Sequence, residues 1–79
     1  MRVLLFARAR ELAAADAIEV VLPVAATVGD LRRRLAEQCP RIAGLATRSA
    51  IAVNGEYSDD ALTLPANAEV ALVPPVSGG

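Results

Sequence analysis

One amphipathic helical pattern lies near the middle of this chain, and the other apolar segments have strand character. The apolar residues of the pattern recur three or four positions apart and form one stripe: Val28, Leu31, Leu35 and Cys39. Thr27 stands three residues before Asp30, the spacing of a capping box at a helix start, and Pro40 ends the pattern. Asp30 is also four residues before Arg34, which favours an ion pair between them. A chain with one such helix must bury its stripe against a sheet.

Two strand patterns precede the helix. Val3–Phe6 is a continuous apolar run, and the segment 17–22 alternates apolar residues with others until Pro23 ends it. The segment between the two runs is polar and rich in alanine, and it contains Arg10 and Glu11. We interpret it as a loose bend, so that the two runs form an antiparallel hairpin.

Three further strand patterns follow the helix. Ile51–Val53 leads into Asn54-Gly55, the strongest short signal for a hairpin turn, and Glu56-Tyr57 begins a short return strand. Glu69–Val73 is the last strand, and Pro74-Pro75 ends it. These segments predict a second hairpin and a final strand that completes the sheet.

The order strand, strand, helix, strand, short strand, strand predicts an α+β domain with the β-grasp, or ubiquitin-like, architecture. We expect a mixed sheet of about four to five strands with one main helix packed on one of its faces. The domain is expected to span residues 1–73, and residues 74–79 are expected to form an extended C-terminal tail that ends in Gly-Gly.

The first and last strand patterns are apolar on both faces. Val3 and Leu5 alternate with Leu4 and Phe6 in the first, and the last reads Val70, Ala71, Leu72, Val73. One helix covers only one face of a sheet, and the other face of a sheet that meets water is normally polar. We therefore expect an exposed apolar patch, which on a small domain marks a protein interface.

The composition excludes several classes of function. The chain has no histidine and one cysteine, so it cannot assemble a serine–histidine or cysteine–histidine catalytic site or the usual zinc ligands, and we expect no metal. The net charge of −1 argues against nucleic acid as a partner. One cysteine forms no internal disulfide, and no apolar run has the length of a membrane span. We expect a cytoplasmic protein with no membrane partner.

The C-terminal segment has the properties of a threading tail. Two prolines hold Pro74-Pro75 extended, and from Pro74 onward six residues reach roughly 20 Å when fully extended. Gly78 and Gly79 leave the last peptide without side chains, so the tail can enter a narrow channel in another protein. Its terminal carboxylate is ionised at neutral pH and is a weak nucleophile towards a nucleotide phosphate.

Short motifs along the whole chain match one family. They are Leu5-Phe6-Ala7, Arg10-Glu11-Leu12, Thr27-Val28 with Leu31 and Leu35, Val53-Asn54, Glu69-Val70-Ala71, and the ending Pro74-Pro75-Val76-Ser77-Gly78-Gly79. With these residues the chain resembles the ubiquitin-like sulfur-carrier proteins, and among them the small subunit of molybdopterin synthase. Two departures are Ala66-Asn67-Ala68, where the family often has Asp-Gly-Asp, and Leu72-Val73, where it often has aromatic residues. The second departure makes the expected partner contact smaller.

The resemblance implies a cycle of sulfur transfer at Gly79. An ATP-dependent adenylating enzyme activates the carboxylate, and a sulfur donor protein then converts it to a thiocarboxylate. The tail (Pro74, Pro75, Val76, Ser77 and Gly78) threads into the large subunit of molybdopterin synthase. There it donates sulfur to cyclic pyranopterin monophosphate and forms the dithiolene. The chain is then a non-catalytic subunit of a heterotetrameric sulfurtransferase, with no permanently bound cofactor, and its partner enzyme uses the ATP.

The resemblance also assigns an interface. Phe6, Tyr57 and Val73 match apolar positions that the family uses against its partners, whereas Arg10 and Glu11 match its first loop and are given no role beyond a salt bridge or a solvated turn. Three alternatives stay open: a sulfur carrier for thiazole, cysteine or tRNA thiolation, a ubiquitin-like protein modifier joined through Gly79, and an interaction domain with an inert tail.

Overall fold

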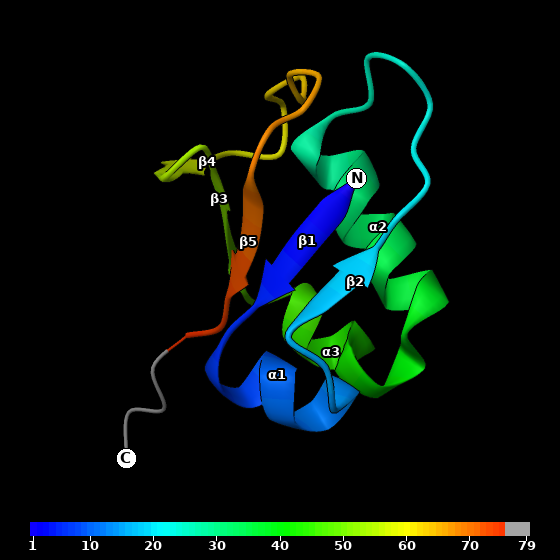
Figure 1. The fold of residues 1–79 in the computed structure, drawn as a ribbon, viewed down its shortest axis with the longest axis vertical. Helices are drawn as coiled ribbons and strands as arrows, with labels where there is room; N and C mark the ends of the chain where they lie inside the picture. Colours follow the sequence, from blue (N-terminus) through cyan, green and yellow to red (C-terminus); the bar gives the residue numbers. More distant parts are fainter. Residues whose placement is uncertain (76–79) are drawn as a thin grey trace.

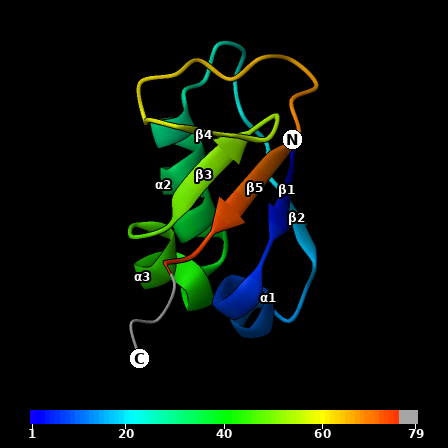
Figure 2. The same cartoon turned by 90° about the vertical axis from the view of Figure 1, so that its left-hand side faces the viewer.

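The strands form one mixed sheet with helices on one of its faces (Figures 1 and 2). The computed structural model describes residues 1–75, within which the strands are β1 (Arg2–Leu5), β2 (Ala17–Glu19), β3 (Ala50–Val53), β4 (Glu56–Ser58) and β5 (Val70–Val73). The sheet has five strands in the order β2-β1-β5-β3-β4. β1 and β5 are parallel, and the other neighbours are antiparallel. The predicted α+β, ubiquitin-like architecture is confirmed.

The main helix, α2 (Val28–Gln38), begins and packs as its sequence predicts. The Asp30 backbone N–H donates to Thr27 Oγ1 at 3.2 Å, and the Thr27 N–H donates to Asp30 Oδ2 at 2.9 Å, which completes the capping box. Val28, Leu31 and Leu35 are fully buried, and Cys39 packs at the margin of the core. The expected ion pair with Arg34 is wrong, because Asp30 pairs with Arg33, which lies three residues along the same helix surface.

The connection between β1 and β2 is helical, so the predicted loose bend is wrong. It contains α1 (Ala7–Ala13), which ends at Ala14 in the left-handed conformation with φ 56°. Alanine has the highest helix propensity, and the segment buries Ala9 completely while Leu12 packs against the core. A short 3-10 helix, η1 (Pro40–Ile42), and α3 (Ala43–Ala46) follow α2, so the helical layer has more parts than the single stripe indicated.

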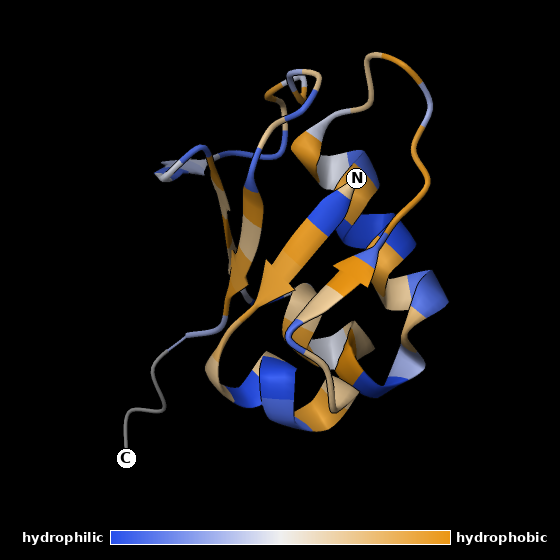
Figure 3. Cartoon of the chain, in the orientation of Figure 1, coloured by the Kyte–Doolittle hydropathy of each residue, from blue (hydrophilic) through white to orange (hydrophobic). Residues whose placement is uncertain are grey.

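The core lies between the sheet and this helical layer. Alternate residues of the three central strands point into it and are nearly or completely buried: Val3 and Leu5 of β1, Ile51 and Val53 of β3, Val70 and Leu72 of β5. They meet Leu31 and Leu35 of α2 and Ile42 of η1 in one cluster. Figure 3 shows β1 and β5 coloured as hydrophobic along most of their length, whereas β4 is not. Each of the three central strands therefore gives one face to the core, whereas β4 has no buried residue.

A tight turn joins β3 to β4, and the side chain of Arg32 links α2 to the segments before and after this hairpin. Asn54 and Gly55 both have positive φ, 51° and 83°, as the tight turn between β3 and β4 requires, so the predicted hairpin is confirmed. Arg32 of α2 is mostly buried and donates to the carbonyl oxygens of Ala46 and Ser49 at 2.7 and 2.5 Å, and its Nη2 lies 2.9 Å from Asp60 Oδ1. This arginine ties α2 to both ends of the β3–β4 unit.

No helix in the segment 1–75 has the length and apolar character needed to cross a membrane.

The capping box makes stability depend on acid pH. The pKa of Asp30 lies below its ordinary value, first because the Thr27 backbone N–H binds the carboxylate, then because of the Thr27 hydroxyl and Arg33. A carboxyl whose pKa is depressed by folding stabilises the fold above its unfolded pKa, and this stabilisation is lost as the pH falls through the folded pKa. We expect Asp30→Asn to be less stable than the parent at pH 7, with the difference shrinking below about pH 4. Urea unfolding of the parent and the variant at pH 7 and below about pH 4 measures this difference in stability, and an equal difference at the two pH values would contradict the prediction.

Candidate partner interface and tail exit

The sheet face opposite the helices carries a continuous apolar row. The strand register places Ala17, Leu4, Ala71, Ala52 and Tyr57 opposite one another, in that order, from β2 to β4. A second, shorter row follows towards the C-terminal end of β5, where Ala50 is opposite Val73 and Phe6 continues β1 beyond Leu5. We call these eight residues the outer sheet patch: Leu4, Phe6, Ala17, Ala50, Ala52, Tyr57, Ala71 and Val73.

The three predicted interface residues all belong to the outer sheet patch. The exposed fraction is 47% for Phe6 and 75% for Tyr57, and Val73 is half-buried. Their neighbours of opposite parity, Leu5 and Leu72, are 2% and 0% exposed. Phe6 is therefore outside the core, although its apolar run alone fitted a core strand as well. The structure brings the three together on one face, and their contact with a partner stays a prediction.

The alanines of the outer sheet patch were not expected from the sequence, except Ala71. Ala17, Ala50 and Ala52 occur in ordinary strand patterns, and a single exposed alanine has no meaning by itself. The register aligns Ala17 and Ala52 with Leu4 and Ala71 and places Ala50 opposite Val73, so small apolar residues form the centre of the patch. Such a centre lets another protein approach closely over most of the sheet.

The tail leaves the domain beside this patch. β5 is the central strand, and its last residue, Val73, pairs with Ala50 of β3. Pro74 is buried and Pro75 is exposed, so the first proline of the predicted tail packs against the domain and the second lies in solvent. Figures 1 and 2 show this exit at the end of the sheet where α1 and α3 lie. The predicted tail residues Val76, Ser77, Gly78 and Gly79 lie outside the described residues.

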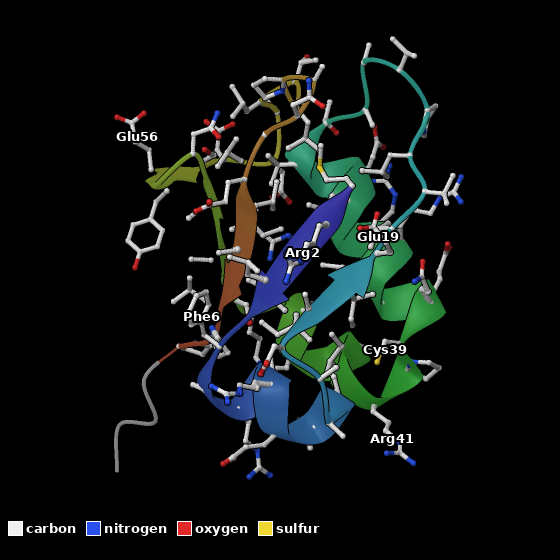
Figure 4. The ribbon with its side chains drawn as sticks, viewed as in Figure 1. Arg2, Phe6, Glu19, Cys39, Arg41 and Glu56 are labelled. Carbon is white, nitrogen blue, oxygen red and sulfur yellow. The ribbon has the colours of Figure 1, made fainter. Side chains whose placement is uncertain are left out.

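Cys39, Arg10 and Glu11 lie outside the outer sheet patch. Among residues 1–75, no group of three or more His, Cys, Asp or Glu side chains is arranged to hold a metal ion. Cys39 lies at the end of α2, on the helical side of the molecule, whereas Phe6 lies beside the tail (Figure 4). Arg10 pairs with Asp16 at 2.8 Å, and Glu11 is exposed nearby. The salt bridge expected as one role for Arg10 is present.

Comparisons with known proteins identify the family of the chain. The ThiS family model matches residues 3–79 of the chain. Two curated relatives carry the name molybdopterin synthase sulfur carrier subunit. The protein from Dictyostelium discoideum is 38% identical over 99% of this chain and 94% of its own. The protein from Arabidopsis thaliana is 33% identical over 100% of this chain and 82% of its own.

Similar solved structures come from archaea and bacteria. SAMP1 from Haloferax volcanii has a TM-score of 0.85 at 30% identity, covering 99% of this chain and 97% of its own. A molybdopterin converting factor subunit 1 from Pyrococcus furiosus has a TM-score of 0.82 at 31% identity, covering 95% of both chains. The subunit 1 and 2 complex of molybdopterin-converting factor from Helicobacter pylori matches in fold, with a TM-score of 0.68 at 20% identity over 99% of this chain and 96% of that one.

The family match includes both the described domain and the Gly-Gly ending, and the identity to the two curated relatives extends over essentially the whole chain. The chain belongs to the ThiS family.

Proposed function

We propose that this chain is the sulfur-carrier subunit of a molybdopterin synthase, and that Gly79 carries the sulfur as a C-terminal thiocarboxylate. The observation that carries the proposal is the name shared by the two curated relatives, both of which match this chain from end to end. The family match that runs to residue 79 supports the same chemistry, because it includes the residue that would carry the sulfur.

The proposed cycle has three steps. The Gly79 carboxylate attacks the α-phosphate of ATP on an adenylating enzyme and forms an acyl-adenylate with release of pyrophosphate. A sulfur donor protein then replaces the adenylate, which leaves as AMP, and a thiocarboxylate remains. In the large synthase subunit, the thiocarboxylate sulfur forms a bond to a carbon of cyclic pyranopterin monophosphate, and water then cleaves the acyl–sulfur bond, which leaves the sulfur on the pterin and returns Gly79 to a carboxylate. Two loaded tails supply the two sulfurs of the dithiolene.

The described fold supports this division of labour. The tail begins at the end of the central strand, beside an apolar face that is free to dock. The outer sheet patch holds no ionisable side chain except the Tyr57 phenol, so we expect the partner to supply the acids, bases and phosphate-binding cations. The chain on its own is then not an enzyme and binds no permanent cofactor. We expect it to work in the cytoplasm, where its partners and ATP meet.

A reconstitution tests the proposed function. The chain is prepared with a Gly79 thiocarboxylate, verified by mass spectrometry of the C-terminal fragment, and mixed with the large subunit and the sulfur-free pyranopterin. We expect dithiolene product with this chain and none with a chain that lacks Gly79, because the truncated chain ends without the sulfur-bearing residue. Equal thermal unfolding of both chains is the control. Product from the truncated chain would contradict the mechanism, and no product from the verified thiocarboxylate would indicate another sulfur pathway, such as thiazole, cysteine or tRNA thiolation.

A charge in the outer sheet patch should separate docking from folding. Val73→Asp places a carboxylate beside the tail exit, and we expect it to weaken binding to the large subunit about tenfold or more while costing about 1 kcal/mol of stability. Isothermal titration and urea unfolding measure the two effects. Val24→Asp is the matched control, because Val24 is 99% exposed in the loop before α2. If Val73→Asp unfolds the chain instead, Val73 is a core residue.

A second candidate function is covalent attachment to other proteins. One observation favours it: the structural match to Haloferax volcanii SAMP1, also described as small archaeal modifier protein 1, at 27–30% identity. This chain contains no lysine, so as a modifier it would be attached singly rather than in chains through its own side chains. Incubation with the adenylating enzyme and cell extract should then give larger products on a denaturing gel that disappear when Gly79 is deleted. Absence of such products excludes this function for the conditions that load the sulfur.

A further inference from the structure

Charged residues frame the outer sheet patch unevenly. At the end remote from the tail, Arg2 of β1 lies opposite Glu19 of β2, and the parallel register of β1 with β5 brings Glu69 to its other side. Glu56 is exposed in the neighbouring hairpin. Figure 4 shows Arg2, Glu19 and Glu56 away from the tail. The N-terminal ammonium of Met1 pairs with Glu19 at 3.1 Å, so this end has two cations against three carboxylates and a small excess of negative charge.

Two exposed arginines, Arg8 and Arg48, come from segments next to the tail end of the outer sheet patch. Arg8 follows Phe6 by two residues, and Arg48 precedes Ala50 by two residues. Phe6 follows β1 and Ala50 begins β3, and these strands lie on either side of β5. The two arginines therefore come from the two segments that flank the tail exit. Both are exposed, and neither makes a salt bridge within residues 1–75. The Arg48 Nε donates to the Gly44 carbonyl of α3 at 3.3 Å, which holds that side chain at this end of the sheet.

The apolar centre of the patch gives a partner contact area but does little to fix the orientation in which the partner binds. Its alanines offer similar contacts from either end of the sheet, whereas a threading tail needs one orientation only. Charges at the rim of an interface raise the association rate and fix the orientation more than they raise affinity. The six residues from Pro74 reach roughly 20 Å when extended, so Arg8 and Arg48 would lie at the entrance of a channel and far from its chemical end.

We propose that Arg8 and Arg48 orient the chain on its partner by facing carboxylates at the mouth of the channel that receives the tail. The partner surface that fits this face has an apolar centre, acidic residues where the tail enters and a neutral or basic opposite edge. This inference rests on the proposed function, because it takes the large synthase subunit as the partner. It adds the charge pattern that directs the tail into the channel and not across the sheet.

Association kinetics with the purified large subunit test the proposal. We expect the double variant R8E/R48E to associate about tenfold or more slowly than the parent at about 20 mM salt, with dissociation within about twofold of the parent. The gap should close at about 0.5 M salt, because screening shortens the reach of charges. The lysine variant R8K/R48K should associate like the parent, since it keeps the charge.

Arg41→Glu is the matched control. It makes the change of charge of one of the two substitutions, the same as Arg8→Glu alone, on exposed Arg41 of η1, which Figure 4 places on the helical side, away from Phe6. If R8E/R48E associates at the same rate as Arg41→Glu and with the same salt dependence, the proposal is wrong and the proposed function is unaffected. A parent chain that does not bind the large subunit would overturn the proposed function and this inference together. Thermal unfolding checks that each variant folds. If loss of the Gly44 contact unfolds Arg48→Glu, Arg8→Glu alone is the test. We expect this single variant to show part of the slowing.

Discussion

The position of β5 at the centre of the sheet is the constraint on which the rest of this structure depends. The strand pairs with β1 on one side and β3 on the other, and its inward residues Val70 and Leu72 are completely buried. A strand with both edges paired has no freedom to shift register without moving its apolar residues to the wrong face. The position of Val73, where β5 ends and the tail begins, is therefore fixed by the packing of the whole domain.

This arrangement also explains why an apolar surface is left exposed. The parallel pairing of β1 and β5 needs a crossover between them, and the chain supplies it with helices that all lie on one face (Figure 2). The opposite face then has no element of its own chain to cover it. In the outer sheet patch it carries alanine, leucine, phenylalanine, valine and tyrosine, and an exposed apolar patch on a small domain is a candidate site for a protein partner. The fold therefore places the docking face and the tail exit side by side.

A carrier benefits from keeping chemistry and recognition apart. The tail that would carry sulfur has no ionisable side chain, and the outer sheet patch has none except the Tyr57 phenol. Such a chain can present one reactive terminus to successive enzymes, because each enzyme brings its own acids, bases and cations. In the proposed scheme, the face gives contact area, and Arg8 and Arg48 give orientation.

The sequence by itself determined the elements whose signals are local. The stripe and capping box of α2, the Asn54-Gly55 turn and the double apolar parity of β1 and β5 each lie within a few residues, and each is present in the structure. The tertiary structure alone decided that the alanine-rich segment after β1 forms α1, because burying Ala9 and packing Leu12 needs the rest of the core. It alone decided that Ala17, Leu4, Ala71, Ala52 and Tyr57 share one row, and that Arg8 and Arg48 flank the same exit. These groupings join residues far apart in the chain, and only the register of non-adjacent strands brings them together.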